Sequence, residues 1–244
     1  MVHWPEVMFT YDVTERILFS ADAFGTFKTL SGALYADETD FDREYLDEAR
    51  RYYSNIVGKY GSKVQAVFKK LEGVPVDMIC GYIMGKYDLW SRYEPEEKGV
   101  VIAYTSMYGN TAAVADRLAL LLKERGVANV TMYDVTRMHP SYVVSDAFRF
   151  TNIVLAAPTY NNALHPTMSA VIEDMENMAV QNRRYSLIGN GSWAPQSPRI
   201  MEERMSKLKD MTKVGETFVV KSSMRDDQLP ELEKLADEIA ASMA

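Results

Sequence analysis

The sequence contains very little cysteine, with Cys80 as the one thiol in 244 residues. A single cysteine excludes an intrachain disulfide, and thiol-poor chains are typical of reducing compartments. No uninterrupted apolar run approaches the roughly 18 residues of a membrane-spanning helix. The first residues also lack the basic and apolar regions of a signal peptide. We therefore expect a cytoplasmic protein with no membrane partner.

Excess positive charge is missing as well. Lys and Arg number 27 against 34 Asp and Glu, which gives a formal net charge of −7. Binding to nucleic acid requires clustered cations that displace counterions, and an anionic membrane surface attracts the same side chains. The charge balance therefore indicates no nucleic-acid partner, and it is compatible with a basic protein partner.

The composition that is present is that of a globular protein, with 47% hydrophobic and 25% charged residues. A chain of this length is long enough for two modest domains. The run Glu94-Pro95-Glu96-Glu97-Lys98-Gly99 is a charged linker that contains a helix-stopping proline. We therefore predict one domain over residues 1–97 and a second over residues 98–244.

The second domain has an alternating pattern of short apolar runs and longer amphipathic runs. Strands are predicted at 100–104, 130–133, 153–157, 185–188 and 217–220. Helices are predicted at 111–125, 141–148, 166–178, 197–208 and 228–243. Alternation of this kind predicts an α/β fold with a parallel sheet covered by helices on both faces.

The first domain has a mixed pattern. Two β-rich runs, 7–11 and 17–20, flank a polar turn and predict a hairpin. Helical periodicity follows over 41–71, with a break expected at Gly61-Ser62, and a further helix is predicted at 81–93. We expect a short strand at 74–80 between these helices.

A hydroxyl-rich turn follows the first strand of the second domain and leads directly into a helix. The turn consists of Thr105, Ser106, Met107, Tyr108, Gly109, Asn110 and Thr111. The start of a helix aims backbone N–H groups and the positive end of the helix dipole at one point, which favours a phosphate. The turn has neither the G-x-G-x-x-G pattern of dinucleotide sites nor the lysine of a P-loop. Alone, the same pattern also fits an ordinary helix N-cap.

Two further segments follow strands of the same predicted sheet. One consists of Pro158, Thr159, Tyr160, Asn161 and Asn162, and the other of Asn190, Gly191, Ser192 and Trp193. Ligands of doubly wound sheets bind at the carboxyl ends of the strands. Each segment offers one aromatic ring among small hydrogen-bonding residues, so the pair can sandwich a flat heterocycle. His139 and His165 each precede a proline at a helix start, and we expect neither to be a catalyst.

These three segments resemble the phosphate loop and the two ring-flanking loops of flavodoxins. The run from Tyr104 to Thr111 is similar to that of the flavodoxin domain in flavodiiron proteins. This resemblance covers residues 99–244 and implies a five-stranded, doubly wound parallel sheet in the order 2-1-3-4-5. It also implies FMN as the cofactor, with the phosphate at the first turn and the isoalloxazine ring between the other two segments.

Residues 1–95 resemble the C-terminal part of the metallo-β-lactamase-like domain of flavodiiron proteins, a partial α+β segment. The matching runs are 3–11, 19–25 and 86–93. The resemblance implies that His3 stands at an iron-ligand position and Asp22 at an iron-bridging position. The H-x-E-x-D-H motif of that family does not occur in the sequence, and the histidine turn expected after residues 76–80 is missing. We therefore expect His3 and Asp22 to be vestigial and no complete diiron site.

The main hypothesis is an FMN-binding electron-transfer protein that works with a redox partner protein. One alternative is a flavoprotein component of an oxygen or nitric oxide reductase whose metal site is completed by a partner chain. A second is a non-catalytic assembly module with an empty pocket. A partial sandwich exposes strand edges and an apolar face. We therefore expect a homodimer, with the aromatic segments 45–53 and 82–93 as its contacts.

Overall fold

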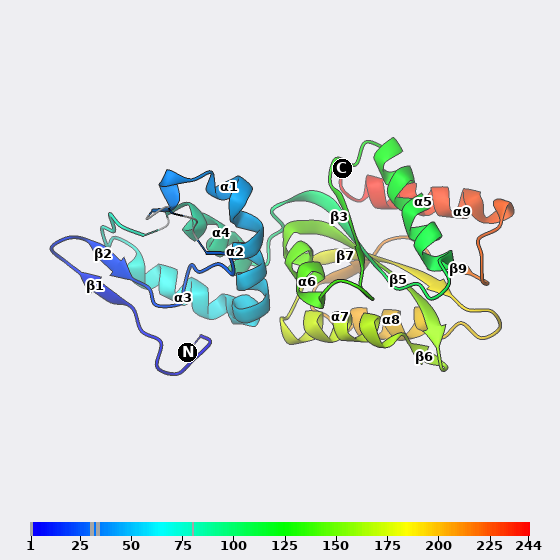
Figure 1. Cartoon of the computed structure of the whole chain (residues 1–244), viewed down its shortest axis with the longest axis horizontal. Coiled ribbons are helices and arrows are strands. Elements are labelled where there is room, and N and C mark those ends of the chain that lie inside the picture. The colour runs from blue at the N-terminus through cyan, green and yellow to red at the C-terminus, as the bar shows by residue number, and fades with distance from the viewer. Residues whose placement is uncertain (1, 30–31, 33–34, 80) are drawn as a thin grey trace. The chain divides into compact units, whose positions relative to one another are not determined.

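The computed structural model describes residues 2–29, 32, 35–79 and 81–244. The chain divides into two compact units, Met1–Glu94 and Pro95–Ala244, called here the N-terminal unit and the C-terminal unit (Figure 1). Cys80 lies outside the described residues.

A parallel sheet forms the centre of the C-terminal unit. Its main strands are β3 (Glu97–Tyr104), β4 (Val130–Asp134), β5 (Phe150–Tyr160) and β7 (Arg183–Asn190). They lie in the order β4-β3-β5-β7, and two short strands, β8 (Met211–Lys213) and β9 (Phe218–Val220), both pair in parallel with β7. The predicted order 2-1-3-4-5 is confirmed, with the fifth position shared by β8 and β9.

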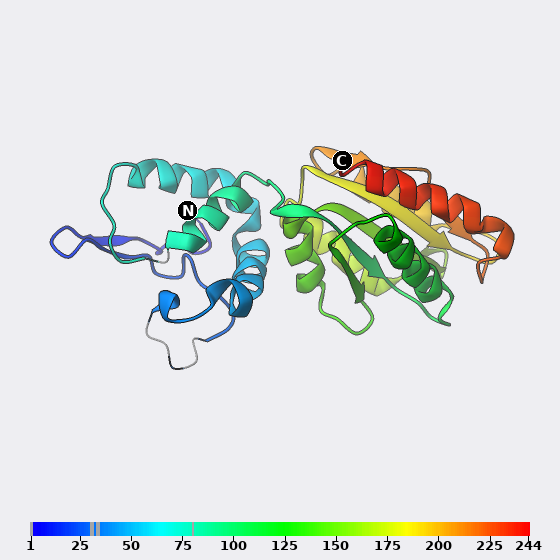
Figure 2. The ribbon, with the colours of Figure 1, turned by 90° about the horizontal axis from the view of Figure 1, so that it is seen from above.

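Five α-helices of the C-terminal unit cover both faces of this sheet. On one face lie α5 (Asn110–Glu124) and α9 (Leu229–Ala241), the latter after a short 3-10 turn at Asp226–Gln228. On the other lie α6 (Pro140–Arg149), α7 (Pro166–Asn177) and α8 (Ser197–Met205), as Figures 1 and 2 show. The predicted α/β class is therefore confirmed, although α8 and α9 end earlier than the apolar pattern suggested.

The side chains of the central strands point alternately to the two faces of the sheet, and this explains why helices pack on both faces. Val100 and Ile102 of β3 contact the core formed with Leu118 of α5 and Leu235 of α9. Val101, between the first two, is equally buried and points to the opposite face, because successive side chains of a strand alternate. A strand with both faces buried needs helices on both sides.

The N-terminal unit begins with the predicted hairpin, formed by β1 (Thr10–Asp12) and β2 (Ile17–Phe19) in antiparallel register. The Asp12 carboxylate stabilises its turn by accepting hydrogen bonds from the backbone N–H groups of Thr14 and Glu15, at 2.8 and 3.1 Å. The strands are shorter than predicted because β1 starts only at Thr10.

Helices make up most of the remainder of the N-terminal unit. After a 3-10 turn at Ala36–Glu38 come α1 (Phe41–Glu44), α2 (Leu46–Tyr52), α3 (Gly61–Leu71) and α4 (Gly81–Ser91). A π-helical turn at Tyr53–Val57 and a 3-10 turn at Gly58–Tyr60 separate α2 from α3. The break was predicted at Gly61-Ser62, whereas Gly61 is the first residue of the new helix.

The strand predicted at 74–80 is wrong. Residues 74–79 contain only an isolated bridge, between Ile17 and Met78. The Leu18 N–H donates to the Met78 carbonyl at 3.3 Å. Pro75 lacks the N–H group that a ladder requires, and Gly73 adopts a positive φ of 77°. Both features interrupt a strand.

An aromatic cluster fills the core of the N-terminal unit. Tyr53 packs against Tyr87 and Trp90 with ring centroids 4.7 and 5.2 Å apart. Burial raises the pKa of the Tyr53 and Tyr87 hydroxyls above the ordinary tyrosine range. The expected dimer contacts are therefore wrong for Tyr45, Tyr53, Tyr87 and Trp90, since each is at most 2% exposed inside the unit.

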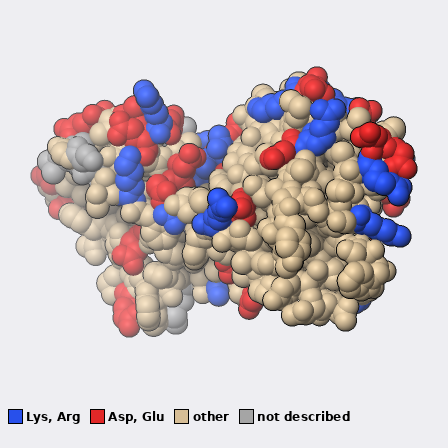
Figure 3. All heavy atoms as spheres, turned by 45° about the vertical axis from the view of Figure 1, so that its right-hand side comes forward, with Lys and Arg blue, Asp and Glu red and all other residues tan. Residues whose placement is uncertain are grey.

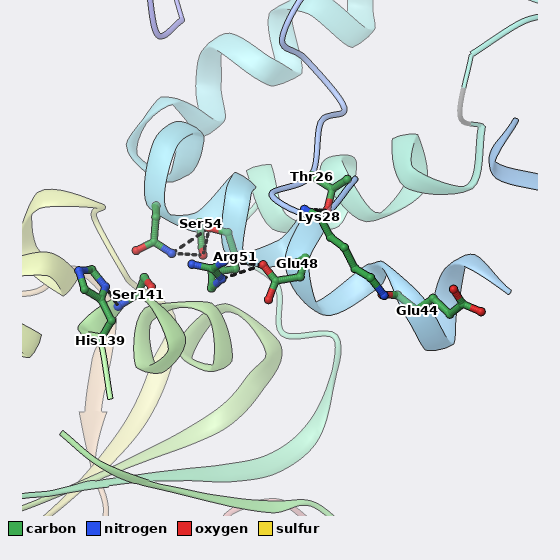
Figure 4. A network of polar contacts seen from close by, with 9 residues as sticks. Thr26, Lys28, Glu44, Glu48, Arg51, Ser54, His139 and Ser141 are labelled. Carbon is green, nitrogen blue, oxygen red and sulfur yellow. Dashed lines mark hydrogen bonds and ion pairs between the residues drawn. The ribbon is translucent and has the colours of Figure 1, made fainter. Parts of the chain in front are cut away.

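Polar contacts stabilise α1 and α2. Arg51 forms an ion pair with Glu48 at 2.6 Å, and Lys28 donates to the backbone carbonyl of Glu44 at 3.1 Å (Figure 4). Both side chains of the ion pair are partly buried, with exposed fractions of 22% and 26%. These polar contacts add to the aromatic cluster in the core of this unit.

Close packing of α3 against α4 yields a stability prediction. A Cβ atom at Gly61 would lie 2.3 Å from the backbone oxygen of Ser91, whereas a Cβ at Gly85, inside α4, meets nothing within 4 Å. We expect Gly61→Ala to destabilise the protein by about 1–3 kcal/mol through overpacking. Gly85→Ala, the matched control, is expected to stabilise it by about 0.5–1 kcal/mol. Thermal unfolding followed by circular dichroism measures both, and an unchanged midpoint for Gly61→Ala contradicts the packing described.

Candidate functional site

The three predicted segments all lie at one end of the central sheet. Strands β3, β5 and β7 are adjacent and parallel, so their carboxyl ends meet at the same edge (Figure 1). The chain order of the strands reverses between β3 and β5, because β4 lies beyond β3 and β7 beyond β5. Crevices at such reversal points are where doubly wound sheets bind ligands.

The turn after β3 begins with a hydrogen bond to β5 and ends with a glycine in the left-handed conformation. The Thr105 N–H donates to the Ala156 carbonyl of β5 at 2.9 Å. Gly109 has a left-handed φ of 87° at the position before α5, which most other residues avoid. Between these two points, Met107 and Tyr108 are exposed to solvent, with Tyr108 86% exposed.

Two hydroxyl groups in this turn lack partners. Thr105 Oγ1 and Ser106 Oγ are buried, and no residue in the described part of the chain hydrogen-bonds to either oxygen. A buried polar atom without a partner costs about 1–3 kcal/mol. Both hydroxyls precede the first residue of α5, where the helix dipole favours negative charge. The donors therefore fit a bound anion such as a phosphate monoester.

The segment after residue 157 differs from its prediction as a loop. Pro158, Thr159 and Tyr160 continue β5, and Thr159 and Tyr160 pair with the short antiparallel strand β6 (Ala163–Leu164). The turn between the strands holds Asn161 and Asn162 at left-handed φ values of 48° and 57°. Asparagine tolerates this region better than most residues, which explains a tight hairpin that the strand pattern did not reveal.

The side chain of Thr159 supports the neighbouring helix α8. Its hydroxyl oxygen accepts the backbone N–H groups of Gln196 and Ser197 at 2.8 and 3.1 Å. Tyr160 lies edge-on to the ring of His165, with centroids 5.5 Å apart, and remains 37% exposed. Tyr160 and Thr159 were both predicted to contact the flavin ring. Tyr160 has exposed surface for such a contact, whereas the Thr159 hydroxyl is already hydrogen-bonded within the protein.

The segment after β7 carries the second exposed aromatic ring. Asn190 is the last residue of β7 and is buried, whereas Ser192 and Trp193 are exposed, Trp193 by 89%. The Gly191 N–H donates to the Val220 carbonyl at 3.1 Å. A Cβ at Gly191 would lie 2.9 Å from Pro195 Cα, so the close backbone approach here needs glycine.

A fourth segment, after β9, reaches the same site and was not predicted. The Asn110 side-chain amide donates to Ser222 Oγ at 3.5 Å, and the Asn190 side-chain amide contacts both Thr111 and Ser222. Lys221, Ser222 and Ser223 directly follow β9, the last strand of the sheet. The carboxyl-end rule applied to this strand would have found Ser222.

Charged side chains are missing from the three predicted segments. In Figure 3, which brings this end of the C-terminal unit forward, uncharged residues cover most of the visible centre and the charged ones gather at its margins. Burial raises the pKa of the Tyr104 hydroxyl at the end of β3, and the nearby Asp134 and Asp116 carboxylates raise it further. The three predicted segments therefore offer a ligand dipoles and hydroxyl groups, whereas the fourth segment, after β9, also contains Lys221.

The two predicted vestigial iron positions lie near each other in the N-terminal unit, with His3 Nε2 3.9 Å from Asp22 Oδ2. Within the described residues, no group of three or more His, Cys, Asp or Glu is placed to hold a metal ion. The remaining histidines make local contacts. His139 accepts the backbone N–H of Ser141 at 3.2 Å (Figure 4), and His165 Nδ1 lies 2.9 Å from Thr167 Oγ1.

The N-terminal unit also has a cavity of about 560 Å³. Phe9, Phe24, Phe68 and Leu71 contribute to its mainly apolar wall. Its lining residues all belong to the N-terminal unit. No helix in the described ranges is both long and apolar enough to span a bilayer.

Comparison with known proteins gives the same assignment for the C-terminal unit. The family described as Flavodoxin domain matches residues 101–237. The anaerobic nitric oxide reductase flavorubredoxin of Aeromonas hydrophila is 31% identical over 208 residues, which cover 79% of this chain and 41% of that protein.

Two solved structures share the fold over almost the whole chain. Rubredoxin oxygen:oxidoreductase from Desulfovibrio gigas matches with a TM-score of 0.88 and 24% identity, covering 100% of this chain and 63% of that one. The flavodiiron protein of Giardia intestinalis matches with a TM-score of 0.82 and 22% identity, covering 99% and 64%.

The chain therefore belongs to the flavodoxin domain family, and it is similar to the flavorubredoxin and the two flavodiiron-type structures named above. This confirms the predicted resemblance. Membership implies FMN as the cofactor, in agreement with the unpartnered hydroxyls at the start of α5. The chain spans 41% of the length of the flavorubredoxin it matches.

The role of Thr159 in supporting α8 can be tested by substitution. We expect Thr159→Val, which keeps the shape but removes the acceptor, to destabilise the protein by about 0.5–2 kcal/mol, as the loss of a helix cap does. Thr212→Val is the matched control, since Thr212 lies exposed on the short strand β8. Chemical denaturation measures both variants. Equal stability of the two variants would be incompatible with a capping role.

Proposed function

We propose that the C-terminal unit binds FMN between the ends of β3, β5 and β7 and transfers electrons to or from a redox partner protein. The observation that carries this proposal is the pair of buried, unpartnered hydroxyls of Thr105 and Ser106 at the start of α5. FMN supplies one- and two-electron transfer when bound. The protein residues bind it, orient it and control its exposure to water.

At the phosphate end, hydroxyls and backbone amides act together. Thr105, Ser106 and Thr111 contribute hydroxyl groups, while Gly109 and Asn110 lie where the first amides of α5 are free of intrahelical partners. Hydrogen bonds to a charged acceptor contribute about 1.5–3 kcal/mol each. Several such bonds, aligned with the helix dipole, hold a dianion without a lysine.

At the ring end, two aromatic side chains flank the proposed isoalloxazine position. Tyr160 comes from the end of β5 and Trp193 from the segment after β7, and both have exposed surface available for stacking. Asn161, Asn162, Gly191 and Ser192 provide polar groups for the rim of the ring. Met107 and Tyr108, also exposed, are in the phosphate turn itself. Stacking on Trp193 removes apolar surface from water on both partners.

The relatives suggest the kind of chemistry that the electrons serve. One is described as an anaerobic nitric oxide reductase flavorubredoxin and another as a rubredoxin oxygen:oxidoreductase. For this chain we propose electron transfer by the flavin, with residues 98–244 as the flavin domain and residues 1–97 as a metallo-β-lactamase-like segment. A homodimer remains part of the proposal, with contacts other than the buried aromatic residues.

A second candidate function is that of a reductase component that carries iron. The observation in its favour is the 3.9 Å approach of His3 and Asp22, the two positions that correspond to iron ligands by resemblance. Iron analysis of purified protein separates the candidates. Electron transfer by flavin alone predicts FMN without stoichiometric iron, whereas about two irons per chain would favour the reductase component.

The phosphate assignment predicts selective effects on FMN. We expect the double substitution Asn110→Ala, Thr111→Ala to weaken FMN binding by about 10-fold or more, because it removes hydrogen-bonding groups from the phosphate end. Binding of riboflavin, which has no phosphate, should change by less than about 2-fold. Fluorescence titration with both flavins measures this. Unchanged FMN affinity would falsify the assignment of this turn.

The ring assignment predicts the opposite pattern. Trp193→Ala removes a stacking surface, so we expect FMN and riboflavin to lose affinity by the same factor, about 3- to 10-fold. Trp4→Ala, at an exposed tryptophan of the N-terminal unit, is the matched control and should change neither affinity. A loss confined to FMN would show that Trp193 does not stack on the ring.

A further inference from the structure

Asn190 connects three segments of the proposed flavin site through its side chain. Its amide nitrogen donates to Thr111 Oγ1 at 3.3 Å and to the Ser222 carbonyl at 2.8 Å. Its amide oxygen accepts the Ser222 N–H at 3.1 Å. One buried side chain, 6% exposed, therefore joins the end of β7, the first turn of α5 and the segment after β9.

We infer that Asn190 is a positioning residue for the phosphate end of the site, and that the segment after β9 forms a fourth wall there. This inference rests on the proposed FMN function and deepens it. The sequence pattern predicted instead that Asn190 contacts the cofactor directly, because the residue stands beside Gly191 and Trp193 in the ring-flanking segment.

The orientation of the amide follows from its partners. A carbonyl oxygen only accepts hydrogen bonds and a backbone N–H only donates, so Ser222 fixes which side of the Asn190 amide is nitrogen. Both amide hydrogens are then in use, one toward Ser222 and one toward Thr111. No donor of this side chain is left for the edge of an isoalloxazine ring.

The contact with Thr111 sets the direction of the threonine hydroxyl. Thr111 Oγ1 accepts the Asn190 amide hydrogen, and its own hydrogen therefore remains available to donate. Thr111 is in the first turn of α5, and the unpartnered hydroxyls of Thr105 and Ser106 belong to the turn that leads into this helix. A phosphate at this helix start is an acceptor for all three donors, and Asn190 thus prepares one of them.

The contact with Ser222 fixes the segment after β9. Ser222 has a left-handed φ of 73°, an unusual conformation for serine that needs support from its surroundings. The two Asn190 bonds to its backbone provide this support, and its hydroxyl accepts the Asn110 amide at 3.5 Å. Asn110, the first residue of α5, is therefore held from the same side as Thr111.

This arrangement predicts that Asn190 acts on discrimination between FMN and riboflavin. In Asn190→Ala the three bonds are lost, so we expect FMN affinity to fall by about 10-fold while riboflavin affinity falls by less than about 2-fold. In Asn190→Asp the donor facing Thr111 and the Ser222 carbonyl is replaced by a carboxylate oxygen, which also adds negative charge beside the phosphate. We expect a larger FMN loss for this variant, reduced by added salt because salt screens the repulsion.

The experiment is fluorescence titration of the full chain and both variants with FMN and with riboflavin, at low and high salt. Asn152→Ala is the matched control, because Asn152 is also buried and donates to Ser242 at 2.8 Å, but lies near the start of β5, away from the strand ends. This control should leave the ratio of the two affinities unchanged. Riboflavin binding by the Asn190 variants also reports that they are folded, and the Asp variant preserves the size of the side chain if the Ala variant is unstable.

The possible outcomes distinguish failure of the inference from failure of the proposed function. A selective loss of FMN affinity supports the inference. Equal loss of both flavins, or no loss of either, overturns it and assigns Asn190 to the ring or to the fold alone, while the proposed FMN function stands. If the unmodified chain takes up neither flavin, the proposed function itself fails, and the inference with it.

Discussion

The unsatisfied hydroxyl groups at the end of β3 are the constraint on which the site depends. Thr105 and Ser106 place donors in a buried position without partners, directly before a helix whose dipole favours an anion. Folding tolerates such groups where a ligand satisfies them. The parallel sheet makes this possible, because it brings the carboxyl ends of β3, β5 and β7 to the same edge.

The three predicted segments of the site also lack charge. None of them contains Lys, Arg, Asp or Glu, so these segments stabilise a dianion by oriented dipoles, while Lys221 belongs to the fourth segment after β9. Dipoles act only when they are held in place. Residues that position these dipoles are therefore needed even where they contact no ligand. Thr159 accepts hydrogen bonds from backbone amides at the start of α8, and Asn190 joins Thr111 to Ser222. Together they hold the segments that would contact FMN.

The N-terminal unit is stabilised differently from the C-terminal unit. Its core is a cluster of aromatic rings from α4 and the turn after α2, and its hairpin is too small to bury a face alone. The apolar cavity of about 560 Å³ beside this core includes His3 and Asp22 in its wall. The relatives contain additional polypeptide, since the chain covers 63% of the Desulfovibrio gigas structure. The fold of this unit is shared with that protein, while any metal chemistry remains proposed.

The sequence by itself determined the alternation of strands and helices and the parallel sheet, because buried strands and amphipathic helices have strong local periodicities. The strand order and FMN as the cofactor followed from the resemblance of the turn at Thr105 to Thr111 and of the two ring-flanking segments to those of flavodoxins. Only the tertiary structure decided which side chains are free to bind. The sequence predicted Thr159 and Asn190 as ligand contacts. In the structure, both side chains instead form hydrogen bonds with residues that are distant along the chain. Ser222 was overlooked although it closely follows β9, and its contacts with Asn190 of β7 and Asn110 of α5 join residues distant along the chain.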